Sequence, residues 1–102
     1  MREYDIFIPL FYNDGNAIEP TKFQDLQRRL LEQFDGLTYF PQANHGFWKF
    51  GEITYRDEIV IYRVIGRDAT SARQFLGDLK EHLKRDLRQE EILIIEREIG
   101  LL

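Results

Sequence analysis

The chain has 102 residues, a formal net charge of −4 and no cysteine. Its length fits one domain, and its 43% hydrophobic and 31% charged residues are ordinary for a globular protein. The lack of cysteine excludes disulfides, thiolate metal sites and cysteine nucleophiles. The acidic balance disfavours non-specific contact with phosphate backbones, so a nucleic-acid partner is not expected. No apolar run is long enough to span a membrane and no signal region precedes the first strand, so a cytoplasmic protein without membrane contact is expected.

The first predicted element is a strand over residues 4–11, which is apolar on both alternating faces except at Asp5. Pro9 has no backbone N–H, so we expect the strand to become irregular near it. A helix follows, with Pro20 in its first turn. Its core-facing side chains recur every three or four residues: Phe23, Leu26, Leu30 and Phe34.

The centre of the chain is predicted to form two strands joined by a turn at Gly51. The first of them covers residues 37–40, is interrupted over 41–46, and resumes over 47–50. The second covers residues 53–65 and is rich in β-branched side chains, which makes it the clearest strand in the sequence.

A second helix is predicted after Gly66, with Asp68 or Thr70 as its N-terminal cap. Its core-facing stripe consists of Ala72, Phe75, Leu76, Leu79, Leu83 and Leu87. The last predicted strand covers residues 91–99, and both of its faces are apolar in the first half.

This order predicts an α+β domain over residues 1–102 with the ferredoxin-like βαββαβ plan, in which two helices cover one face of a four-stranded antiparallel sheet. The other face should then be partly apolar. The residues expected on it are Phe7, Phe11, Ile92 and Ile94. Exposed apolar patches commonly mark binding partners, and an isologous contact needs only one such surface. We therefore expect a homodimer or another protein partner on this face.

The segment 44–58 lies between glycines and holds most of the candidate binding residues. They are His45, Trp48, Tyr55, Arg56 and Glu58. An arginine can hold a carboxylate or phosphate with two parallel hydrogen bonds, and Trp and Tyr combine an apolar body with a polar tip. The plainer interpretation is a long twisted hairpin whose aromatic side chains pack across the strands, and it is the favoured one.

Recognised catalytic and metal-binding patterns are absent from the sequence. His45 and His82 are the only histidines and do not have the spacing of metal ligands. Asp57 and Glu58 are adjacent, so on a regular strand they point to opposite faces. The single serine, Ser71, lies at a helix start, where a capping role is expected. No catalytic residue, metal or cofactor is therefore assigned.

Short motifs along most of the chain are shared with a known group of sequences. They are Asp14-Gly15, Phe23, the stretch Phe34-Asp35-Gly36-Leu37-Thr38, Gly46-x-Trp48, Gly51-x-Ile53 and Arg56-Asp57-Glu58. In these features the chain resembles a family of small bacterial proteins of unknown function. It departs from that family in the arrangement of acids near Arg56 and in lacking the export segment that many members carry. The family has no settled activity, so the resemblance implies the fold and no mechanism.

Three functions are compatible with these patterns. The leading hypothesis is a non-enzymatic module that binds itself or another protein through the open face of its sheet. The alternative is a small-molecule enzyme or sensor of the dimeric α+β barrel type, with a pocket near the hairpin over residues 44–58. A weaker alternative is a nucleic-acid-associated accessory protein. The missing catalytic constellation favours the first hypothesis, and the charged and aromatic hairpin keeps the second open.

Overall fold

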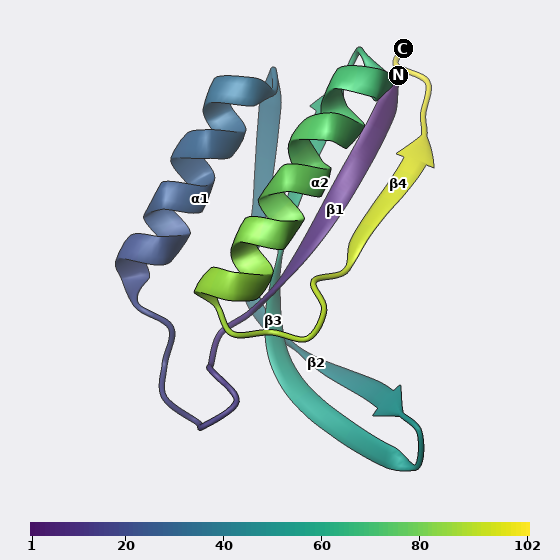
Figure 1. Cartoon of the computed structure of the whole chain (residues 1–102). Coiled ribbons are helices and arrows are strands. Elements are labelled where there is room, and N and C mark those ends of the chain that lie inside the picture. Colours follow the sequence, from purple (N-terminus) through teal and green to yellow (C-terminus); the bar gives the residue numbers. More distant parts are fainter.

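The predicted order of elements is confirmed in the computed structural model, which describes residues 1–102 (Figure 1). The elements are β1 (Arg2–Pro9), α1 (Pro20–Gln33), β2 (Gly36–Phe50), β3 (Ile53–Gly66), α2 (Ala69–Asp86) and β4 (Ile94–Glu98). The strands form one antiparallel sheet in the order β2-β3-β1-β4. Both helices lie on the same face of this sheet (Figure 1), so the fold is the expected α+β ferredoxin-like arrangement.

The hydrophobic core lies between the sheet and the two helices. Tyr4 and Ile6 of β1 alternate toward the helices and pair with Val64 and Tyr62 of β3, and all four are almost fully buried. The buried helix residues that meet them are Leu26 and Leu30 of α1, and Ala72, Leu76, Leu79 and Leu83 of α2. These are members of the stripes that helical periodicity predicts. No helix combines the length and apolar character that a membrane crossing requires.

The predicted interruption of the second strand is a shift in register. Phe40 pairs with Ile61, but Asn44 pairs with Ile59, so extra residues of β2 are accommodated between these two pairs. Pro41 lies inside the shift and has no N–H to donate, which prevents a regular ladder of hydrogen bonds there. The strand continues beyond the shift with a new register.

The last strand is shorter than predicted, and two residues predicted on the open face lie on the core side instead. Ile92 is 1% exposed and belongs to the core, and Ile94 packs against the core. The expectation that Ile92 and Ile94 lie on the open face of the sheet is therefore wrong. The reason is register: Ile94 pairs with Ile6, whose side chain faces the helices, so the residues at odd positions of β4 face the other way.

Asp68, one of the two predicted caps, caps α2. Its Oδ1 accepts hydrogen bonds from the backbone N–H groups of Thr70 and Ser71, at 3.0 and 3.2 Å. We predict that Asp68→Ala lowers the free energy of unfolding by about 1 kcal/mol, because both N–H groups lose their partner. Thr70→Ala should change it by less than about 0.5 kcal/mol. Urea unfolding of the wild type and both variants measures this, and equal losses in the two variants would contradict it.

Candidate functional site

The face of the sheet that no helix covers presents side chains from all four strands, and we call it the open face. It consists of Glu3, Asp5 and Phe7 of β1, Thr38 and Phe40 of β2, Ile61, Arg63 and Ile65 of β3, and Ile95 and Arg97 of β4. These residues alternate with core residues along each strand. The charged side chains of β1, β3 and β4 lie together, and apolar side chains surround them.

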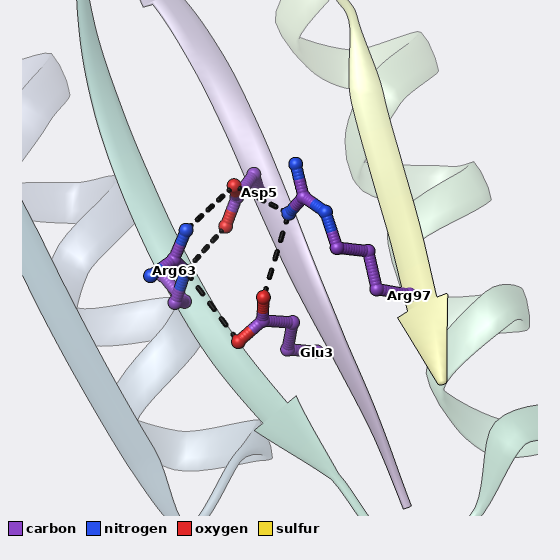
Figure 2. A network of polar contacts seen from close by, with 4 residues as sticks. All are labelled: Glu3, Asp5, Arg63 and Arg97. Atoms are coloured by element: carbon purple, nitrogen blue, oxygen red, sulfur yellow. Dashed lines mark hydrogen bonds and ion pairs between the residues drawn. The ribbon is translucent and has the colours of Figure 1, made fainter. Parts of the chain in front are cut away.

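Four charged residues of the open face form a single network (Figure 2). Arg63 donates from Nε and Nη2 to the two carboxylate oxygens of Asp5, at 2.8 and 3.0 Å. Arg97 donates from Nη1 to Asp5 Oδ2 at 2.8 Å. Glu3 contacts both arginines, with N–O distances of 3.6 Å to Arg63 and 3.4 Å to Arg97. Each arginine is thus shared by two carboxylates, and the charges of the network cancel.

Asp5 is only 3% exposed, although no helix lies over it. The side chains of Arg63 and Arg97 remain 35% and 45% exposed, so they shield the carboxylate while keeping contact with water. Hydrogen bonds from Arg63 hold the pKa of Asp5 below its ordinary value of 3.8. Burial opposes this lowering, and the hydrogen bond from Arg97 adds to it. Asp5 is therefore a buried anion whose charge depends on two partly exposed cations.

The apolar part of the open face begins beside this network. Phe7 pairs with Ile61 and is half-buried, as expected for a residue on this side of the sheet. The guanidinium of Arg63 lies 5.1 Å from the ring centroid of Phe40, which is 36% exposed. Phe11, also predicted here, lies beyond the end of β1 and is 41% exposed. The open face therefore offers apolar surface next to a neutral charge network.

The hairpin of β2 and β3 extends beyond the helices, and we call residues 44–58 the arm (Figure 1). Its strands pair regularly from Asn44 to Phe50. Phe50 and Tyr55 pack edge to face with ring centroids 5.8 Å apart. The indole of Trp48 lies so close to Gly46 that a Cβ there would be 3.1 Å from its Nε1. The predicted hairpin with packed aromatic side chains is present, yet several of its large side chains stay in contact with water.

The five predicted binding residues of the arm lie on its two opposite faces. Trp48 pairs with Tyr55, and His45 pairs with Glu58. The two pairs are separated by an odd number of residues along each strand, so their side chains lie on opposite faces. Arg56 lies on the His45 side, because its Nη2 donates to His45 Nδ1 at 2.9 Å. The structure thus brings His45, Arg56 and Glu58 together and places Trp48 and Tyr55 apart from them.

The charge network of the open face was not predicted from the sequence. Asp5 stands alone in an apolar strand, and Arg63 interrupts the β-branched run of β3. Each is the single charge among buried neighbours, which is the pattern of a paired buried ion. That pattern could have suggested that Asp5 and Arg63 meet across the sheet.

A cavity of about 160 Å³ lies between the end of α1 and the start of α2. It is lined by Phe34, Gly66, Asp68 and Ser71, among others, at the end of β3 remote from the arm. The barrel-type hypothesis expects a pocket beside the hairpin. This cavity lies elsewhere and is not that pocket. No group of three or more histidine, aspartate or glutamate side chains is arranged to hold a metal ion.

Comparison with known proteins identifies the fold. No protein-family model matches the chain, and no curated protein matches it. A phage SAM lyase in complex with S-methyl-5′-thioadenosine has a TM-score of 0.72 at 16% identity, over 95% of this chain and 80% of that chain. A mutant of CutA1 from Pyrococcus horikoshii OT3 has a TM-score of 0.63 at 14% identity, over 100% of this chain and 86% of that chain. At these identities the similarity establishes the fold alone, and the resemblance to small bacterial proteins gains no support beyond that fold.

We predict that the Asp5 network makes stability depend on pH in the acid range. Because the pKa of Asp5 is lowered on folding, its contribution is full above 3.8, its ordinary value, and is lost as pH falls through the lower folded pKa. Asp5→Asn should lower the free energy of unfolding at neutral pH by about 1–3 kcal/mol, because an amide N–H₂ then faces an arginine donor.

The difference between wild type and Asp5→Asn should therefore shrink as the solution is acidified. Denaturant unfolding of both proteins between neutral and strongly acidic pH measures it. Glu3→Gln is the matched control, and we expect it to cost less because Glu3 makes longer contacts than Asp5. A difference between wild type and Asp5→Asn that is the same at every pH would contradict the assignment.

Proposed function

We propose that this protein is a self-associating module that binds a second copy of itself through the open face. The observation that carries the proposal is an uncovered sheet face with apolar side chains around a charge network that is already neutral. A sheet normally buries its apolar faces against another layer, and here only one face is covered. Exposed apolar patches of this kind mark interaction surfaces.

The charges favour a second copy over an unrelated charged partner. The network of Glu3, Asp5, Arg63 and Arg97 has no net charge, and each member is paired within its own chain. An identical face would therefore bring no unpaired charge into the contact, where burial of such a charge is costly. An isologous contact between two such faces satisfies both copies equally.

The area needed for a stable contact indicates that the arm takes part. Even if all four strands had the length of the eight-residue β1, about 26 Å, a spacing of about 4.8 Å would give only roughly 500 Å² in projection. A stable interface buries about 800 Å² on each partner. Alternation along β3 places Tyr55 and Ile53 on the same side as Ile61, and these two arm residues are 48% and 58% exposed. The apolar surface thus continues from the open face onto the arm and supplies the missing area.

We predict that Phe7→Glu dissociates the assembly. A carboxylate at this position would be buried without a partner, which costs about 3 kcal/mol or more and weakens association roughly a hundredfold. Sedimentation velocity of the wild type at high micromolar concentration should show a species larger than a monomer, and the Phe7→Glu variant should be monomeric.

Leu31→Glu is the matched control for this experiment. Leu31 is 61% exposed on α1, on the other side of the molecule from the open face, so the same substitution there should leave association unchanged. Thermal unfolding of both variants checks that they remain folded. A wild type that stays monomeric at high micromolar concentration would overturn the proposal.

A second candidate function is the binding of a small molecule of the S-methyl-5′-thioadenosine type. The observation that favours it is the similarity, with a TM-score of 0.72 over 95% of this chain, to the phage SAM lyase that holds this compound. This function corresponds to the sequence-based alternative of a small-molecule enzyme or sensor.

For this candidate we predict that S-methyl-5′-thioadenosine raises the melting temperature. A ligand at a hundred times its dissociation constant stabilises a folded protein by about 2.7 kcal/mol, which gives a clear shift in a domain of this size. Differential scanning calorimetry with and without the compound, and with S-adenosylmethionine in parallel, measures it. The absence of a shift with both compounds would remove this candidate and leave the self-association proposal untouched.

A further inference from the structure

The arm carries two basic side chains that have no acidic partner. Of the 14 lysines and arginines, those without a carboxylate in ion-pair distance are Lys49, Arg56, Arg85 and Arg88. Arg88 lies over the ring of Tyr12, 4.8 Å from its centroid. Lys49 and Arg56 are therefore unpaired on a single hairpin, in a chain whose net charge is −4.

Strand pairing places these two cations on one face of the arm, which we call the basic arm face. Arg56 pairs with Phe47, and Lys49 pairs with Thr54, at successive positions of the same parity. Lys49 and Arg56 are thus diagonal neighbours on the two strands, about 7–8 Å apart. The ends of their long side chains can therefore approach the same ligand. The basic arm face consists of His45, Phe47, Lys49, Thr54 and Arg56, with Glu58 beside Arg56 at its inner end.

The contact between Arg56 and His45 orients the guanidinium. A guanidinium can only donate hydrogen bonds, so His45 Nδ1 is the acceptor in this contact, at 2.9 Å. The remaining N–H groups of Arg56 are free to bind an anion, together with the ammonium of Lys49 and the hydroxyl of Thr54. Two positive charges and a hydroxyl match a phosphate group, which carries close to two negative charges at neutral pH, better than a carboxylate with one.

Phe47 adds an apolar plate to this anion site. Its side chain is 66% exposed, although it lies between the basic side chains of its own face. A planar ring stacked on Phe47 would remove that apolar surface from water, as bases do on exposed aromatic side chains of nucleic-acid-binding proteins. We infer that the basic arm face binds a small phosphate-bearing ligand with a planar ring, of the nucleoside monophosphate class.

The charges around the site favour a single nucleotide over a nucleic-acid strand. A strand needs a row of cations along its phosphates, and this face offers two. Glu58 faces the same side opposite His45, and Glu52 lies in the turn at the tip of the arm. Glu58 opposes a further phosphate beyond Arg56, so the phosphate of the ligand is expected between Arg56 and Lys49.

The inferred site is on the side of the arm opposite to Trp48 and Tyr55, which share the side of the open face. A ligand there and a second copy on the open face would not compete for the same surface. The inference therefore does not rest on self-association, and each can fail without the other.

The test is calorimetric titration of the protein with AMP, inorganic phosphate and adenosine. AMP should bind more tightly than either of the other two, because only AMP engages both the cations and Phe47. Arg56→Gln and Lys49→Gln should each weaken AMP binding about tenfold, the effect of losing one charge-assisted hydrogen bond. Phe47→Ser should weaken binding of AMP and leave that of phosphate unchanged.

Arg85→Gln is the control, because Arg85 is an unpaired cation on α2, outside the arm. It should leave AMP binding unchanged, and none of the four variants should alter the oligomeric state in sedimentation. AMP that binds no better than inorganic phosphate, or that binds equally well to Arg56→Gln, would overturn the inference. S-methyl-5′-thioadenosine has no phosphate, so its binding would have to survive Arg56→Gln and cannot be mistaken for this site.

Discussion

The pairing of the Asp5 carboxylate is the constraint on which the open face depends. β1 lies inside the sheet, and Asp5 points away from the helices, so its partners can come only from the strands on either side, β3 and β4. Arg63 and Arg97 arrive from those two strands and hold the carboxylate between them. A slip of one residue in either register would turn Asp5 or its arginine into the apolar core, which is far costlier than the pairing seen here. The network thus favours the observed register of β3, β1 and β4. Its charges cancel, so the open face is neutral there.

The order of elements and the helix stripes could be predicted because periodicity reports them directly. The direction of β4 could not be predicted in the same way. Its first half is apolar on both faces and its second half carries charges at both Glu96 and Arg97, so neither parity is excluded by the sequence. The structure resolves this by giving each charge a partner on its own side. Glu96 meets Arg73 of α2 at the edge of the core, and Arg97 meets Asp5 on the open face. Both contacts join residues that are remote in the sequence, so no local sequence pattern predicts them.

The candidate binding residues of the arm were grouped because they are close in the sequence, and alternation divides them. Which residues share a face depends on how β2 is aligned with β3, and that alignment changes between Phe40 and Asn44. A local irregularity around Pro41 can be expected from the sequence, but the number of residues it absorbs cannot. The two-residue turn after Phe50 sets the pairing within the arm, so His45 lies opposite Glu58 and within reach of Arg56. The grouping of the arm residues is therefore set by the turn at its tip, and the bulge changes only the alignment of the arm with the rest of the sheet.

A two-stranded hairpin that extends from a domain is marginally stable unless something covers it. Aromatic contacts along one side stabilise the arm. Phe47, Phe50 and Ile53 nevertheless remain more than half exposed. A second copy seated on the open-face side would order the arm and lower the conformational entropy that any ligand on the basic arm face must remove. Because linkage is reciprocal, a ligand that orders the arm from the basic side would strengthen self-association by the same factor. The two faces of the arm differ in chemistry and lie on opposite sides of the same hairpin. Binding at one face would thus be coupled to binding at the other, because both bindings order this hairpin.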